Sequence, residues 1–254
     1  MSSTPELQYR KWLPYWAVFQ ADMHQTIHTW AYRAWLVISL MVLAGFFTYK
    51  VGAYKEAGII QPGSAFMLQT MRYTILGCFT LVVVLTAGCI SSERGTLADS
   101  VLSRGISRYQ YFLGKLHARI VTVLGTFLFL GIATIIGCRF FLHEDLSLLG
   151  SAVALTAICA LLVTIVSCCV TVSAIFNSTA ISIVSVWLLL LGVTLGLSYF
   201  PHVHLSPEVT LQALPHMIQG EYDPKNLLRL FAWAFGISGG VSLIGMGWFA
   251  RRDI

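Results

Sequence analysis

Charged residues are scarce in this chain of 254 residues. Asp, Glu, Lys and Arg together make up 11% of it, hydrophobic residues make up 57%, and the mean hydropathy is +0.76. Soluble domains carry about 25% charged residues, and a helix needs roughly 20 apolar residues to cross a bilayer. The composition therefore excludes a soluble globular protein. It predicts an all-α, polytopic membrane protein, with a single transmembrane domain over residues 1–254 and no sizeable soluble domain.

Several sequence motifs are missing as well. An ATP-binding P-loop requires GxxxxGK[ST], but the Gly114-Lys115 pair is followed by Leu116, so the chain has no ATPase site of its own. The six cysteines show neither zinc-site nor CxxC spacing, and we interpret them as small apolar residues within the membrane. The first 20 residues lack the basic leader, apolar core and cleavage site that would predict a secretory signal.

Uncharged runs predict six membrane-spanning helices. From Leu146 to Pro207 no charged residue occurs for 62 positions, which is too long for one span, and the polar cluster Asn177-Ser178-Thr179 predicts a tight turn within it. The predicted spans cover residues 34–49, 73–90, 120–141, 148–176, 180–200 and 230–250.

Two further segments are predicted to lie at the membrane surface. Residues 12–32 carry aromatic and apolar side chains at three- or four-residue steps, with Asp22 on the polar side, which indicates an amphipathic interfacial helix. Residues 201–229 contain several prolines around a ten-residue apolar stretch that is too short to cross a bilayer. We expect an interfacial or re-entrant hairpin of two short helices there, on the outer side.

Basic residues indicate the orientation. With the N-terminus inside, the inner segments hold ten Lys and Arg residues and the outer segments hold six. Cytoplasmic loops carry the excess of Lys and Arg. The sequence therefore predicts an inner-membrane protein with both termini in the cytoplasm.

A polar segment over residues 91–119 separates the second and third predicted spans. Ser91-Ser92-Glu93 is typical of a helix start, and Gly105 can end that helix. Ser107 and Gln110 have the spacing of a capping box, which predicts a second helix that runs into the third span. An ordinary topology-setting loop would explain the basic residues, but it would not require two capped helices. We expect that second helix to bury Tyr109, Phe112, Leu113 and Leu116.

This segment resembles the first cytoplasmic loop of ABC transporter permeases of the type-2 export family. It reads SSERGTLADSVLSRGISRYQYFLGKLHARI over residues 91–120, and many family members have Pro where this chain has Gly105. The positions that match the family pattern are Glu93, Gly95, Thr96, Leu97, Ser107, Arg108, Gly114 and Lys115.

The resemblance implies a membrane subunit that works as a dimer with a second copy or a related permease. A separate ABC ATPase would bind ATP and Mg²⁺, and the helix after Glu93 would be the coupling helix that docks on it, with Arg94 and Arg108 as polar anchors. No cofactor is expected in this chain. The residues expected to couple to the ATPase are Glu93, Arg94, Gly95, Thr96, Leu97, Val101, Leu102, Ser107 and Arg108.

Other functions remain as alternatives. Gly236-Ile237-Ser238-Gly239-Gly240 matches the GxSxG pattern of serine hydrolases, but no histidine lies in the same span, so a membrane enzyme is the less favoured reading. Ala232, Gly236 and Gly240 recur every four residues, which predicts a helix-packing stripe. His202 with His204, or His24 with His28, could hold a soft metal ion, and some relatives of the family serve in copper-enzyme maturation. A membrane subunit that binds an ATPase but transports nothing is the remaining alternative.

Overall fold

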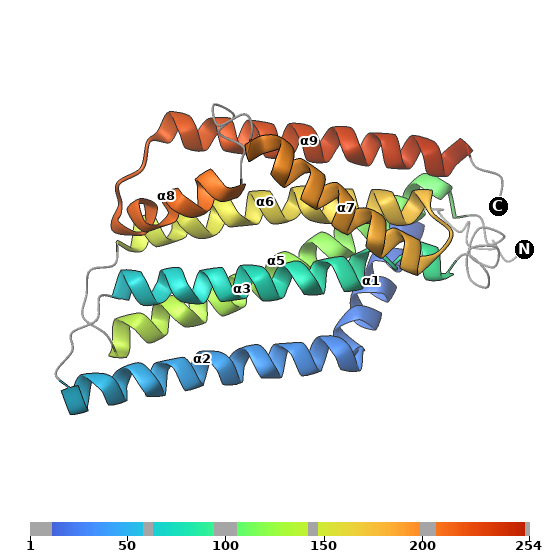
Figure 1. Ribbon diagram of the computed structural model, residues 1–254. Helices are drawn as coiled ribbons and strands as arrows, with labels where there is room; N and C mark the ends of the chain where they lie inside the picture. Colours follow the sequence, from blue (N-terminus) through green and yellow to red (C-terminus); the bar gives the residue numbers. More distant parts are fainter. Residues whose placement is uncertain (1–11, 58–62, 94–105, 142–146, 199–206, 252–254) are drawn as a thin grey trace, which may run out of the picture.

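The protein is a bundle of long helices in the computed structural model (Figure 1). The structure describes residues 12–57, 63–93, 106–141, 147–198 and 207–251. In these ranges there is no strand, so the all-α fold class is confirmed. The elements are α1 (Leu13–His28), α2 (Trp30–Ala57), α3 (Gly63–Thr86), the 3₁₀ turn η1 (Ser91–Glu93), α5 (Arg108–Phe141), α6 (Leu148–Ile175), α7 (Thr179–Ser198), α8 (Pro207–Gln219) and α9 (Pro224–Arg251).

Several of these helices are long and apolar enough to cross a bilayer. Within the described residues they are Tyr32–Gly52, Arg108–Phe140, Leu148–Ile175 and Pro224–Arg251, with shorter apolar helices over Leu81–Glu93 and Thr179–Val193. The chain is therefore a multi-pass membrane protein.

Helix α6 forms the centre of the bundle. It carries no charge and packs against α3, α5, α7, α8 and α9. Its start is fixed by Ser147, whose hydroxyl accepts a hydrogen bond from the Gly150 amide at 3.2 Å. The predicted break around Asn177 is confirmed, because α6 ends at Ile175 and α7 begins at Thr179.

The amphipathic helix is interrupted within the predicted range 12–32. Thr29 has an extended backbone, with ψ of 138°, so α1 ends at His28 and α2 leaves it at an angle (Figure 1). The Tyr32 hydroxyl lies 2.6 Å from the Thr126 hydroxyl of α5, which holds the start of α2 on the bundle. Trp12, Trp16 and Trp30 are exposed, as a helix at the membrane surface requires.

The helix bounds differ from the predicted spans at several places, and α2 runs on to Ala57 rather than ending at residue 49. Helix α3 begins at Gly63, ten residues before the predicted start, and ends at Thr86, because residues 87–90 form a separate turn. In the segment after residue 201, one short helix, α8, is followed by α9, which starts at Pro224 rather than at residue 230. Residues 224–229 of the predicted hairpin thus form the start of α9 and no separate short helix, and a proline is well suited to the first position of a helix.

The start of α5 buries a different set of side chains from the one predicted. Phe112 and Leu116 are buried, but Tyr109 is 51% exposed and Tyr111 is buried in its place. Tyr111, Lys115 and Arg119 follow one another at four-residue steps, so they lie on one side of the helix. This polar side faces α1 and η1.

Candidate functional site

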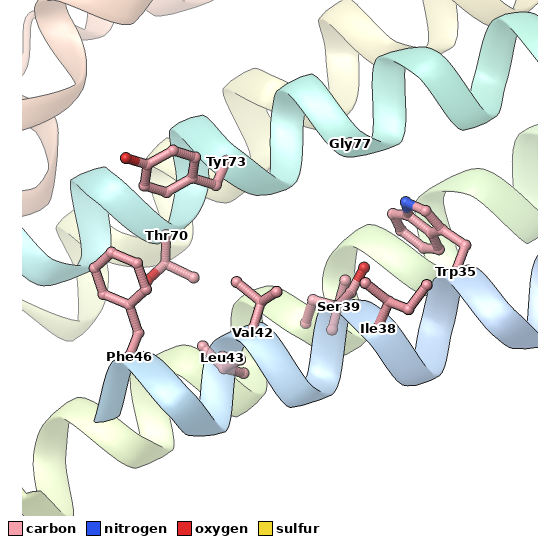
Figure 2. Close-up of a pocket in the computed structure, with 10 residues that line it drawn as sticks. Trp35, Ile38, Ser39, Val42, Leu43, Phe46, Thr70, Tyr73 and Gly77 are labelled. Atoms are coloured by element: carbon pink, nitrogen blue, oxygen red, sulfur yellow. The ribbon is translucent and has the colours of Figure 1, made fainter. Parts of the chain in front are cut away.

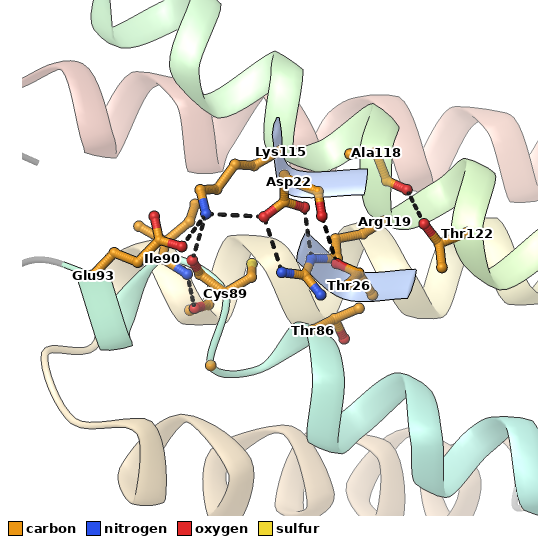
Figure 3. Close-up of polar contacts among 12 residues, drawn as sticks. Asp22, Thr26, Thr86, Cys89, Ile90, Glu93, Lys115, Ala118, Arg119 and Thr122 are labelled. Carbon is orange, nitrogen blue, oxygen red and sulfur yellow. Dashed lines mark hydrogen bonds and ion pairs between the residues drawn. The ribbon is translucent and has the colours of Figure 1, made fainter. Parts of the chain in front are cut away.

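Four ionisable side chains meet where α1, η1 and α5 come together (Figure 3). Asp22 comes from α1, Glu93 from η1, and Lys115 and Arg119 from α5. We call these four residues the charge cluster. Asp22, Lys115 and Arg119 are buried, and Glu93 lies at the edge, directly before segment 94–105.

Lys115 is the hub of the charge cluster. Its Nζ lies 3.0 Å from Asp22 Oδ1 and 2.7 Å from Glu93 Oε1. It also donates to the carbonyl oxygen of Cys89 at 3.1 Å, in the turn between α3 and η1. The three donors of an ammonium group are thereby used on three acceptors. One side chain thus joins α1, the turn and η1 to α5.

Arg119 completes the cluster through its contact with Asp22. Arg119 Nη2 donates to Asp22 Oδ1 at 2.9 Å, and Arg119 Nε lies 2.9 Å from Asp22 Oδ2. Arg119 thus makes one hydrogen bond to the carboxylate, and the contact between Nε and Oδ2 is an ion pair without hydrogen-bond geometry. The Tyr111 hydroxyl donates to Glu93 Oε2 at 2.7 Å, so both carboxylates hold more than one partner.

The charges of the cluster balance, with two carboxylates and two cations. Taking a charge out of water costs several kcal/mol, and a buried pair recovers that cost only with good geometry and further hydrogen bonds. The cluster has further hydrogen bonds, from Lys115 to the Cys89 carbonyl oxygen and from the Tyr111 hydroxyl to Glu93, although Asp22 Oδ2 and Arg119 Nε meet only as an ion pair. Removal of one member would leave its partners buried without a compensating charge. The charge cluster therefore favours one relative position of α1, η1 and α5, in which all its members are paired.

Close packing of α1 on α5 depends on Gly114. A Cβ atom at this position would lie 2.9 Å from Val18 Cγ1 and 3.3 Å from the Tyr15 carbonyl oxygen. The Tyr15 hydroxyl lies 2.9 Å from Nδ1 of His117, one turn further along α5. Burial raises the pKa of the Tyr15 phenol above its ordinary value of 10.0. The Gly114-Lys115 pair thus contacts α1 in two ways. Gly114 allows α1 to approach α5 closely, and Lys115 binds the carboxylate of Asp22 on α1.

The turn before η1 is fastened to α6. The Ser173 hydroxyl accepts hydrogen bonds from the Ile90 amide at 3.1 Å and from the Ser91 amide at 3.2 Å. Ser173 is fully buried. The Ser173 hydroxyl therefore accepts hydrogen bonds from two backbone amides of the turn, which lie outside the regular hydrogen bonding of a helix.

Replacing Ser173 with alanine is expected to destabilise the protein by about 1–3 kcal/mol, because both amides would be left buried without an acceptor. Ser151→Ala is the matched control: Ser151 is also fully buried on α6, and its hydroxyl finds no hydrogen-bond partner among the described residues. Unfolding of both variants in detergent, titrated with SDS, measures the difference. Equal stability of the two variants would contradict this role of Ser173.

The far end of segment 94–105 is fixed as well. The Gln110 amide donates to the Ser107 hydroxyl, and the Ser107 amide donates to Gln110 Oε1, both at 3.2 Å, which confirms the capping box. Arg108 Nη1 donates to the Ala250 carbonyl oxygen at 3.1 Å, near the end of α9. Arg108 therefore binds a carbonyl at the C-terminal end of a helix, where a cation is favoured.

The predicted coupling residues fall into two groups. Glu93, Ser107 and Arg108 are described, and each makes contacts within the chain. Arg94, Gly95, Thr96, Leu97, Val101 and Leu102 lie outside the described residues, as do His202 and His204.

The predicted packing stripe on α9 makes no close contact within the described part of this chain. Ala232, Gly236 and Gly240 are exposed, and a Cβ atom added at Gly236 or Gly240 would meet nothing within 4 Å. The neighbouring side of α9 packs on α6 instead. Its buried residues are Leu230, Ala234, Ser238, Gly245 and Phe249.

Ser238 belongs to this α6–α9 contact. Its hydroxyl lies 2.8 Å from that of Ser167, and both residues are buried. The partner that a serine nucleophile requires is a histidine, whereas the observed partner of Ser238 is a second serine. This geometry favours packing over hydrolysis.

The candidate metal ligands on α1 form a pair. The rings of His24 and His28 are stacked, with centroids 3.9 Å apart, on an exposed side of the helix. Within the described part of the chain, no three His, Cys, Asp or Glu side chains are close enough to hold a metal ion together.

Comparison of the chain with models of protein families gave no match, and comparison with curated proteins gave none either.

Sequence reasoning missed the charge cluster, although its residues carry a signal. Asp22 shares a side of α1 with Val18 and Thr26, four residues away in each direction, and both are buried. Lys115 and Arg119 have the same four-residue spacing on α5. We interpreted Asp22 as polar surface and the two cations as part of a basic loop, because nothing in a single sequence pairs positions 93 residues apart.

Proposed function

We propose that this chain is the membrane-spanning permease subunit of an ATP-driven ABC exporter, of the type-2 export family that its segment 91–120 resembles. A separate ATPase subunit docks on the cytoplasmic segment around residues 94–105. ATP hydrolysis in that partner drives translocation of the cargo. The permease works as a dimer, with a second copy or a related chain.

The observation that carries the proposal is the way both ends of segment 94–105 are held. Glu93 at its start is bound to Lys115 at 2.7 Å, and Arg108 after its end is bound to the Ala250 carbonyl. The described residues on either side of the segment are thereby fastened to α1, α5 and α9. Firm attachment at both sides supports transmission of a displacement from a docked partner to these helices.

The proposal includes six membrane spans, with the N- and C-terminal ends on the cytoplasmic side. It takes α3 and α7 as spans in addition to the four helices above, and α8 with the start of α9 as the re-entrant segment on the outer side. The arrangement of the ends supports this: η1, the first residues of α1 and α5, and the end of α9 lie at one end of the bundle (Figure 1). The excess of basic residues at that end suits the cytoplasm of an inner-membrane protein.

Copurification from cells that supply the native partners tests the proposal. We expect the wild-type chain to bring down a P-loop ATPase, and the variant Leu97→Asp with Val101→Asp to lose most of it, since charges would replace the apolar edge of the predicted coupling helix. Leu228→Asp is the control. It makes the same chemical change at a side chain that is 72% exposed at the opposite end of the bundle.

Each outcome decides between the remaining functions. Absence of any ATPase from folded wild-type protein would overturn the proposal. It would favour the alternative that the chain is a membrane enzyme. An ATPase that binds, but whose hydrolysis moves no cargo in reconstituted vesicles, would identify a non-transporting membrane subunit.

A further inference from the structure

The groove between α2 and α3 carries no metal-binding side chain among the described residues that line it (Figure 2). Trp35 and Phe46 of α2 and Tyr73 of α3 belong to its lining, which includes no histidine, cysteine or carboxylate. Imidazole is a ligand for zinc, copper, nickel and iron ions. Two imidazole rings lie together elsewhere, on an exposed side of α1.

His24 and His28 are one helical turn apart on α1. Side chains four residues apart are neighbours on a helix, with Cβ atoms about 5–6 Å from each other. The two rings are stacked, with centroids 3.9 Å apart and an angle of 22° between their planes. Both residues are exposed, whereas Asp22 on the same helix is buried against α5. The pair therefore presents two ligands of one kind on a side of α1 that an ion can reach.

The backbone fixes which nitrogen of His28 is free. Nδ1 of His28 lies 2.9 Å from the carbonyl oxygen of His24. Because a carbonyl oxygen only accepts, Nδ1 carries the proton, and the neutral ring keeps its lone pair on Nε2. A histidine that binds a metal almost always donates its other N–H in this way, to a carbonyl, a carboxylate or water. His28 is therefore oriented as a metal ligand through Nε2.

The ring of His24 is free to turn. Within the described residues it stacks on His28 and makes no hydrogen bond. Stacked rings direct their lone pairs side by side, whereas an ion must lie about 2.0–2.1 Å from each nitrogen, at a point where both lone pairs meet. Rotation of the His24 ring meets this requirement, and it breaks no hydrogen bond of His28.

The electrostatics at this end of α1 favour a cation. The helix ends at His28, and the carbonyl groups of a last turn carry a partial negative charge. Arg33 already uses this field, since its Nε donates to the Ile27 carbonyl oxygen at 3.4 Å. Arg33 also repels a second cation, but it is exposed, so solvent and salt screen that repulsion.

We propose that His24 and His28 bind one divalent first-row transition-metal ion, with water completing its coordination. Each imidazole gives one nitrogen lone pair to the ion, and the ion joins the last two turns of α1. Cu²⁺ binds most tightly, and Ni²⁺ and Zn²⁺ bind more weakly, in the general order of affinities for such ligands. The site does not rest on the proposed function, because neither histidine belongs to the charge cluster or to segment 94–105.

Binding of Cu²⁺ to the full chain, purified in detergent without a polyhistidine tag, tests the site. With less Cu²⁺ than protein, electron paramagnetic resonance of the wild type should show the ion coupled to two nitrogen nuclei. Calorimetric titration should show affinity weakened at least about tenfold in His24→Gln and in His28→Gln, the loss that follows even when a residue behind a metal ligand is changed.

The matched control is His216→Gln, the same change at a histidine of α8 that is 68% exposed, and it should leave the affinity unchanged. In the His28→Gln background, Gln20→His should restore binding, because two histidines are again one turn apart on an exposed side of α1. Gln25→His in that background should not, since adjacent residues do not face each other on a helix. Circular dichroism selects folded protein.

Affinity that is unchanged in both His24→Gln and His28→Gln would overturn the proposal, as would a wild type that binds no Cu²⁺. Recovery with Gln25→His equal to that with Gln20→His would also contradict it, because any two histidines would then suffice. None of these outcomes bears on the docking of an ATPase at segment 94–105.

Discussion

Asp22→Asn is expected to destabilise the protein by about 3–5 kcal/mol, the cost of breaking a buried ion pair by removing one partner. Arg119 would lose its charged partner, and Lys115 would keep Glu93 and the Cys89 carbonyl oxygen but lose one of its two carboxylates. Both cations are buried, so water cannot replace the lost carboxylate. SDS titration of the purified protein in detergent measures the free energy of unfolding.

Two controls separate this effect from the general loss of an acid. Glu221→Gln makes the matching change at a side chain that is 77% exposed, and it should alter stability by less than about 1 kcal/mol. The double variant Asp22→Asn with Arg119→Met should be less destabilised than the sum of the single variants, because the two residues interact. Additive effects would show that the pair is not coupled.

The same substitution also tests how the cluster acts in the proposed transporter. If Asp22→Asn keeps its bound ATPase but ATP hydrolysis no longer drives transport, the cluster transmits motion from segment 94–105 to α1. If transport per bound ATPase is unchanged in folded protein, the cluster only stabilises the fold.

Gly150→Ala is expected to have the second large effect, a destabilisation of about 1–3 kcal/mol or more from overpacking. A Cβ atom at Gly150 would lie 2.2 Å from the Met217 carbonyl oxygen, 2.8 Å from the Gly220 amide nitrogen and 2.9 Å from the Ile218 carbonyl oxygen. All three are backbone atoms, so no side chain can rotate away. The end of α8 would have to separate from the start of α6, and the bond from the Ser147 amide to the Ile218 carbonyl would be lost.

Gly236→Ala is the matched control, since it makes the same change in the middle of α9 where an added Cβ meets nothing within 4 Å. Alanine has a higher helix propensity than glycine by roughly 1 kcal/mol, so this variant should be as stable as the wild type or slightly more so. Thermal unfolding in detergent compares the two. A Gly236→Ala variant as unstable as Gly150→Ala would show that the exposed side of α9 is packed in the purified protein.

The helical segments could be predicted from the sequence because their signal is local. Apolar runs with few charges specify helices within a membrane, and short polar or proline-containing stretches mark their ends. Asn177-Ser178 separates α6 from α7, and Ser107 with Gln110 caps α5, where the sequence placed them. The start of α3 was missed, because the predicted span was confined to the uncharged run after Arg72, whereas an exposed arginine is compatible with a helix that continues through it.

The sides of the helices could not be assigned in this way. On α9 the sequence offers two small-residue stripes, Ala232-Gly236-Gly240 and Ala234-Ser238-Gly245, and only the packing against α6 selects the second. In the membrane, lipid tails are as apolar as a helix neighbour. Hydrophobicity alone therefore does not tell a buried side from an exposed one.

By itself, the sequence determined that this protein is a multi-pass bundle of helices with a polar segment between α3 and α5, since length, charge and capping residues act over a few neighbours. Only the tertiary structure decided that Asp22 and Glu93 turn inward to share Lys115, and that Gly114 and Gly150 are among the positions where helices touch. These contacts join residues far apart in the chain. They depend on how whole helices are placed, which no local pattern specifies.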